Sequence, residues 1–269
     1  MERKMTEENK PKINADLLKQ MDNIINSADA SVSSRDKEGM TPLMIAVKEE
    51  TVETVQALAA AGSEINAQND AGQTAFMLAV QNGAPDAILD ALISGGADLN
   101  IKDNRGNTAL MYAVSGMETP RLLPKILAAG ANPNIINNDG VSPLMYACSS
   151  NSGLEVIQTL LNAKADSSHL DNEGWSPLMY VVRAKNLKAV EAIINAGTDL
   201  NLRSNNGETA LMLALAHSAS NIDIIKILIA SGSSLAVKDN NGRNALMYAI
   251  YHKADPNVIK ILAALGAKK

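Results

Sequence analysis

Short apolar segments recur along this chain in pairs, and polar residues separate them. The first segment of each pair carries a large apolar residue and a small one three positions later, as at Leu43 and Ala46. The second segment is a longer apolar run, such as Val52–Ala60 or Ile222–Ala230. Residues three or four positions apart share one face of a helix, and a small residue there lets a neighbouring helix come close. Each pair therefore predicts two short, closely packed helices.

The same local sequence surrounds seven glycines that lie 33 to 35 residues apart. Three residues before each glycine stands Asp, Asn or Ser, which together with the glycine is typical of a type I β-turn. Two residues after it stands Thr, Ser or Asn, a residue that caps helix N-termini, and proline follows in three cases. The glycines are Gly39, Gly72, Gly106, Gly140, Gly174, Gly207 and Gly242. Each unit is predicted to be a turn, a helix, a second turn and a second helix.

Glycine also marks the end of most second segments, where a left-handed residue stops a helix. Lys164 takes this place in the fourth unit. A residue with a Cβ atom is strained in that conformation, so we expect either strain or a shift of register at this helix end.

Residues Asp36–Ala46, with the sequence DKEGMTPLMIA, and their six copies resemble the ankyrin repeat. The resemblance covers roughly residues 36–269 and includes unit ends such as Gly96–Asn100. It implies an all-α ankyrin-repeat solenoid, in which stacked helix-turn-helix units carry hairpin fingertips and form a concave binding face. The family usually has histidine after Thr-Pro-Leu, and this chain has methionine there in every repeat, so we expect flexible apolar packing instead of that polar contact.

The chain divides into three expected parts. Residues 1–13 are polar, and we expect them to be disordered. Residues 14–35 are predicted to form a partial capping unit, because Asp16–Asn26 carries apolar residues at helical spacing. The seven predicted repeats are 36–68, 69–102, 103–136, 137–170, 171–203, 204–238 and 239–269.

The last predicted helix, Asn257–Leu265, is apolar and has little polar covering beyond Lys260. Either Lys268 and Lys269 keep this end soluble, or it packs against something else. We expect a monomer, and self-association through the last helix is the alternative.

The resemblance implies that a partner protein binds to the concave face, which the fingertips and the first helices form. The residue after the turn glycine varies freely among the repeats, and Trp175 stands out because tryptophan is enriched among residues that dominate interface energies. The alternative is that the indole packs over a neighbouring fingertip. The predicted partner-binding residues are Met40, Lys48, Gln73, Gln81, Asn107, Val141, Trp175, Arg183, Glu208, His217, Arg243, Tyr251 and His252.

Tyrosine follows the methionine in four of the repeats, and isoleucine or leucine stands there in the others. This alternation favours core packing, and hydroxyl groups that line the groove are the second interpretation. The four residues are Tyr112, Tyr146, Tyr180 and Tyr248.

Charge and composition exclude several classes of partner and location. The net charge is −5 and the pI is about 5.3, so no overall basic field attracts nucleic acid. Cys148 is the only cysteine, so an intramolecular disulfide cannot form. The N-terminus lacks the apolar core of a signal peptide, and no apolar run reaches the ~18 residues of a membrane span. We expect a cytoplasmic protein with no membrane contact; a removed signal peptide or export without a readable signal are the alternatives.

Catalytic motifs are missing from the sequence, and we expect neither an enzyme nor a bound cofactor. Cys148 lies beside Ala147 on the predicted buried side of a helix, where a thiol is inert. The seven methionines after Thr-Pro-Leu and its variants are interpreted as a buried packing column, and a soft-metal site is the second interpretation. We predict a protein-binding scaffold; the alternatives are a self-assembling structural element and a small-molecule or soft-metal sensor.

Overall fold

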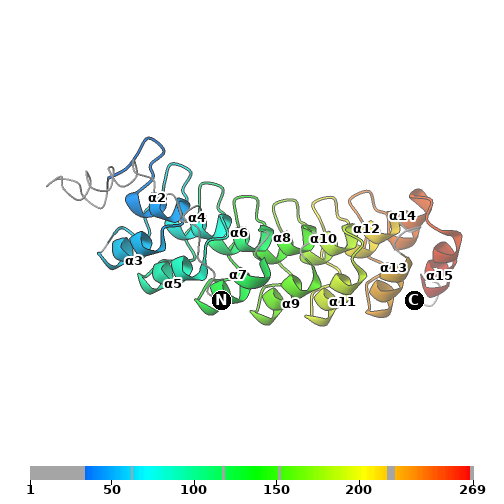
Figure 1. The fold of residues 1–269 in the computed structure, drawn as a ribbon. Helices are drawn as coiled ribbons and strands as arrows, with labels where there is room; N and C mark the ends of the chain where they lie inside the picture. The colour runs from blue at the N-terminus through cyan, green and yellow to red at the C-terminus, as the bar shows by residue number, and fades with distance from the viewer. Residues whose placement is uncertain (1–33, 62, 117–118, 151–152, 217–221, 267–269) are drawn as a thin grey trace, which may run out of the picture.

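The computed structural model describes residues 34–61, 63–116, 119–150, 153–216 and 222–266, and this part forms a ladder of 14 helices in two layers (Figure 1). The first layer consists of α2 (Pro42–Lys48), α4 (Ala75–Gln81), α6 (Ala109–Ser115), α8 (Pro143–Ser149), α10 (Pro177–Arg183), α12 (Ala210–Ala216) and α14 (Ala245–Tyr251). The second layer consists of α3 (Val52–Ala60), α5 (Asp86–Ser94), α7 (Thr119–Ala128), α9 (Leu154–Asn162), α11 (Leu187–Asn195), α13 (Ile222–Ala230) and α15 (Pro256–Gly266). The predicted all-α solenoid is confirmed. The expected disordered segment, nearly all of the capping unit, His217, Lys268 and Lys269 lie outside the described residues.

The first helices begin at the predicted caps. The Thr74 hydroxyl, for example, accepts a hydrogen bond from the Met77 backbone N–H at 3.2 Å, and Ser176 does the same for Met179 at 3.3 Å. Thr108 differs, because its buried hydroxyl has no hydrogen-bond partner. The Met111 backbone N–H there bonds to the Thr108 carbonyl oxygen instead, at 3.1 Å.

The second helices end as the glycine pattern predicts in four places. Gly96, Gly130, Gly197 and Gly232 are left-handed, with φ between 85° and 98°. Lys164 is left-handed too, with φ 67°, so the fourth repeat keeps its register and accepts strain of about 1 kcal/mol.

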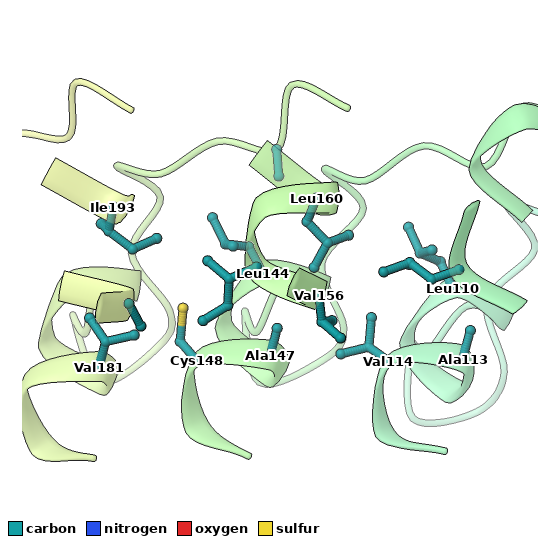
Figure 2. Packing of buried hydrophobic residues seen from close by; sticks show 14 of the residues in the cluster. Leu110, Ala113, Val114, Leu144, Ala147, Cys148, Val156, Leu160, Val181 and Ile193 are labelled. Carbon is teal, nitrogen blue, oxygen red and sulfur yellow. The ribbon is translucent and has the colours of Figure 1, made fainter. Parts of the chain in front are cut away.

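One continuous apolar core runs between the two layers, from the first described repeat to the last. Each first helix contacts the first helix of the next repeat, and each second helix lies beneath its own first helix. Figure 2 shows this packing in the middle of the ladder, where Cys148 lies close to Val181 and Ala147. The small residue of each first helix sits in this core, as at Ala113 and Ala147, and it permits the close approach of neighbouring helices.

Hydrogen bonds between adjacent fingertips hold the repeats together along one edge. Here a fingertip means the β-turn that contains the recurring glycine of a repeat, together with the residue after that glycine. In repeats three to seven an asparagine side chain donates to a carbonyl oxygen of the preceding fingertip, for example from Asn138 Nδ2 to Asn104 O at 2.9 Å. The equivalent donors are Asn104, Asn172, Asn205 and Asn240. Backbone bonds run in parallel, such as Asn138 N to Arg105 O at 3.0 Å. The row of fingertips is therefore cross-linked rather than free.

The ladder is bowed. In Figure 1 the row of first helices sags in its middle, and the fingertips project from the concave side. This side is formed by first helices and fingertips, and the second helices form the opposite, convex side. No helix within the described ranges combines the length and the apolar character needed to cross a membrane.

Candidate protein-binding face

The structure places most of the predicted partner-binding residues on the concave side with exposed or half-exposed side chains. The half-exposed fingertip residues are Gln73, Asn107, Val141, Trp175, Glu208 and Arg243. The exposed residues at or just after the ends of first helices are Lys48, Gln81, Arg183, Tyr251 and His252.

Met40 is wrongly predicted to be accessible. Its side chain is only 5% exposed and belongs to the core cluster. The sulfur lies 3.4 Å from Asn69 Nδ2 of the next fingertip, so the unbranched apolar side chain folds inward at the junction of two repeats. It is not available to a partner.

Trp175, Tyr180 and Arg183 form a contiguous cluster on the fifth repeat. The rings of Trp175 and Tyr180 lie 5.4 Å apart between centroids and are tilted by 55°. The Arg183 guanidinium carbon lies 5.3 Å from the Trp175 ring centroid, within the range of a cation–π contact. The indole thus packs on a tyrosine of its own repeat. The cluster joins a fingertip residue to the last residue of α10.

A buried aspartate holds this cluster in place. Asp171 Oδ1 accepts hydrogen bonds from the backbone N–H groups of Trp175 at 2.7 Å and Glu173 at 3.0 Å. Its second oxygen, Oδ2, accepts from the Tyr180 hydroxyl at 2.6 Å. Burial and, after it, the hydrogen bond to Asp171 raise the pKa of the Tyr180 phenol, so it stays protonated as a donor. Because one carboxylate fixes both the turn and the ring, the aromatic surface is presented in a defined position.

The other three tyrosines make related hydrogen bonds with fingertip residues. Tyr112 donates to Asp103 Oδ2 at 2.6 Å, and Gln73 of the preceding fingertip donates to Tyr112 at 3.3 Å. Tyr248 donates to Glu208 Oε1 of the preceding fingertip at 2.7 Å. Tyr146 is placed between Asn137 Nδ2 at 3.1 Å and Asn107 Oδ1 at 3.3 Å. The rings pack against the core, and the four hydroxyls form hydrogen bonds with fingertip residues.

A second aromatic and cationic cluster lies at the C-terminal end of the concave face. Arg243 forms an ion pair with Asp239 at 2.7 Å and stacks on Tyr251, with its guanidinium carbon 4.3 Å from the ring centroid. The His252 ring lies 5.0 Å from that of Tyr251. Burial acts to raise the pKa of the Asp239 carboxyl, but hydrogen bonds from Arg243 and two backbone N–H groups outweigh burial and hold it below its usual value. The Arg243 charge is thus already compensated.

The face of α14 that carries Met247 and Ile250, called the final face below, differs from the matching faces of the other first helices. Met247 is 52% exposed and Ile250 is 56% exposed, although the matching residues of the six other first helices are buried. Within the described residues no further repeat follows to cover them. Tyr251, 65% exposed, borders the same face, so an apolar surface ends the ladder.

The remaining methionines after Thr-Pro-Leu and its variants support the packing interpretation, since all six are buried. In three of them the sulfur also lies 3.4 to 3.5 Å from the backbone N–H of the helix-capping residue, a weak polar contact in place of pure apolar packing. These residues are Met44, Met145 and Met179.

Cys148 is buried as predicted, and burial strongly raises the pKa of its thiol. Across the described ranges, no three His, Cys, Asp or Glu side chains gather as metal ligands.

Comparison with known sequences decides the family. A sequence model of ankyrin repeats matches the chain in three overlapping copies, over residues 43–123, 118–204 and 179–269. The chain belongs to the ankyrin-repeat family. Among solved structures, it is similar to the ankyrin repeat domain of Bcl-3, a member of the IκB protein family, with a TM-score of 0.73 and 28% sequence identity over 84% of this chain and 100% of that chain. No curated protein matches it significantly.

Ankyrin repeats generally mediate protein–protein interactions and are typically not enzymes. Repeat solenoids present extended concave surfaces to their partners, because each repeat adds one similar unit to the same face. The concave side of this ankyrin-repeat chain carries two aromatic and cationic clusters on a cross-linked frame.

Proposed function

We propose that this chain is a non-catalytic scaffold that binds a partner protein through its concave face. The observation that carries the proposal is the cluster of Trp175, Tyr180 and Arg183. Tryptophan, tyrosine and arginine are the residues most enriched among those that dominate binding energy. In this chain they lie together on the fifth of the seven repeats, where Trp175 and Tyr180 are half-exposed and Arg183 is exposed.

Preorganisation supports the same proposal. Asp171 fixes the fingertip of Trp175, and Asn172 and Asn205 tie that fingertip to its neighbours on both sides. A surface that is rigid before binding loses little conformational freedom on association, so more of the contact energy appears as affinity. Seven repeats spaced by about 10 Å also give a face long enough for the ~800 Å² that a stable interface buries on each partner.

Affinity capture from extracts of the native cell tests this proposal. The bait is the full chain, compared with Trp175→Ala and with Lys188→Gln, a change on α11 in the convex layer of the same repeat. We expect a partner that is retained by the wild type and by Lys188→Gln and is lost with Trp175→Ala. A specific partner that Trp175→Ala retains equally well places the interface elsewhere and refutes the proposal.

A second candidate function is self-association through the final face of α14. The exposed Met247 and Ile250 favour it, because the same positions are covered by a neighbouring helix in every other repeat. Light scattering between micromolar and millimolar concentration tests it. Self-association predicts a rising mass that Ile250→Asn abolishes, and a constant monomer mass for the wild type excludes it.

A further inference from the structure

In the part of the chain that the structure describes, the concave face carries one positively charged group, the guanidinium of Arg183, that stacks on an aromatic ring without a carboxylate partner. Among the residues that the structure describes, no carboxylate lies within ion-pair distance of its guanidinium group and no hydrogen bond engages it. The guanidinium group instead faces the Trp175 ring, and its carbon lies 5.3 Å from the ring centroid. Arg183 is also exposed, as the last residue of α10.

Arg243 also stacks on an aromatic ring of the concave face, but its positive charge is paired with a carboxylate. Both its Nε and one terminal nitrogen lie 2.7 Å from Asp239 Oδ2 while the guanidinium covers Tyr251. Ring stacking and carboxylate binding therefore occur together there, because a stacked guanidinium keeps its N–H donors in its own plane. Arg183 has the ring but lacks the carboxylate.

We infer that Arg183, held against Trp175, receives a carboxylate side chain of the bound partner, next to an apolar side chain that packs on the indole. This inference rests on the proposed protein-binding function and specifies the chemistry of its partner: an acidic segment with an adjacent apolar residue. Arginine can bind a carboxylate through two parallel N–H···O bonds, and the ring beside it lowers local hydration and strengthens that contact.

The surroundings of Arg183 determine which other charges a partner meets. Glu173 is exposed on the same fingertip, and Asp171 is buried and engaged by Tyr180 and by backbone N–H groups. Val141, which holds the position of Trp175 on the preceding fingertip, is half-exposed and apolar. The site is thus one uncompensated cation beside an aromatic and apolar surface, with an acidic group at its rim that disfavours a second carboxylate.

Selection of peptides by the full chain tests the inference without knowledge of the natural partner. A phage-displayed library of random 12-residue peptides is selected on the wild type. Asp and Glu are then counted in the enriched pool relative to the starting library. The best peptide is synthesised together with a counterpart in which Gln or Asn replaces its acid. Binding of both is followed by the emission of Trp175, the only tryptophan of the chain.

We expect an excess of acidic peptides and about tenfold weaker binding of the amide counterpart, the usual effect of losing one charged hydrogen-bonded contact. In Arg183→Gln the acidic peptide and its counterpart should bind equally. Lys188→Gln, which removes the same charge from the convex layer of the same repeat, should keep the tenfold difference. Melting curves confirm that each variant is folded.

The results that would overturn this inference alone differ from those that would also overturn the proposed binding face. Peptides that change Trp175 emission but show no acidic excess, or that bind Arg183→Gln with the same preference, overturn the inference and leave the proposed concave face standing. A pool without any enrichment also overturns it. Enriched peptides that neither change Trp175 emission nor respond to Trp175→Ala overturn both the inference and the proposed face.

Discussion

Tyr146 and Tyr180 provide a matched comparison of polar contacts under the concave face. They occupy the same position in successive repeats, and both are half-buried with their rings against the core. The Tyr180 hydroxyl donates to the buried carboxylate of Asp171 at 2.6 Å. The Tyr146 hydroxyl lies between the neutral amides of Asn137 and Asn107 at 3.1 and 3.3 Å. Removing each hydroxyl with a Phe substitution therefore removes a charged contact in one repeat and neutral contacts in the next.

The expected costs differ in magnitude. Loss of a hydrogen bond to a charged group, with the buried acceptor left unpaired, should lower the free energy of unfolding by about 2 kcal/mol in Tyr180→Phe. Loss of neutral, longer bonds in Tyr146→Phe should lower it by about 1 kcal/mol. Asp171 Oδ1 keeps its two backbone donors in the first variant, so the turn itself should persist.

Urea denaturation followed by Trp175 emission measures both costs, because this single tryptophan reports on the fifth repeat directly. The order of the two variants is the critical result. Equal costs, or a larger cost for Tyr146→Phe, would refute the argument that Asp171 organises this part of the face.

Three further predictions concern the frame. Gly106→Ala should destabilise the fold by at least about 2 kcal/mol and Gly130→Ala by about 1 kcal/mol. Both glycines are left-handed, but of the two only Gly106 lies where an added Cβ atom would meet a backbone nitrogen, that of Asn138 at 2.6 Å. Equal melting temperatures of the two variants would contradict this reasoning. Asp239→Asn should cost about 2 kcal/mol at pH 7. The pKa of Asp239 is lowered in the folded state, so the extra stability of the wild type over Asp239→Asn should be lost as the pH falls below about 4. Urea denaturation measures this difference, and a difference that stays constant between pH 7 and pH 3 argues against the ion pair. Cys148 should react with a thiol reagent only on unfolding, and rapid labelling of the native chain would show that the core opens.

The sequence predicts the frame well because the frame is built from local contacts. A turn aspartate bonds to backbone groups two and four residues away, and a helix cap to a group three residues away, so Asp171 and Ser176 act within one short segment. Such contacts recur in each repeat, and the periodic sequence shows them directly.

Contacts between repeats were harder to predict. Tyr248 meets Glu208 and Gln73 meets Tyr112 across 39 or 40 residues, and only the stacking distance brings these side chains together. The burial of Met40 depends in the same way on the next fingertip. One signal was available: asparagine recurs just after the first turn residue in repeats three to seven, which indicates the fingertip hydrogen bonds.

Site-specific photo-crosslinking of the captured partner shows which face of the ladder it contacts. A photoreactive residue is placed at Val141, half-exposed on the concave face, or at Lys188, exposed on the convex layer of the adjacent repeat. Binding to the concave face predicts a covalent adduct with the partner from position 141 and none from position 188. An adduct from position 188 alone would contradict it, because the partner would then bind the second helices.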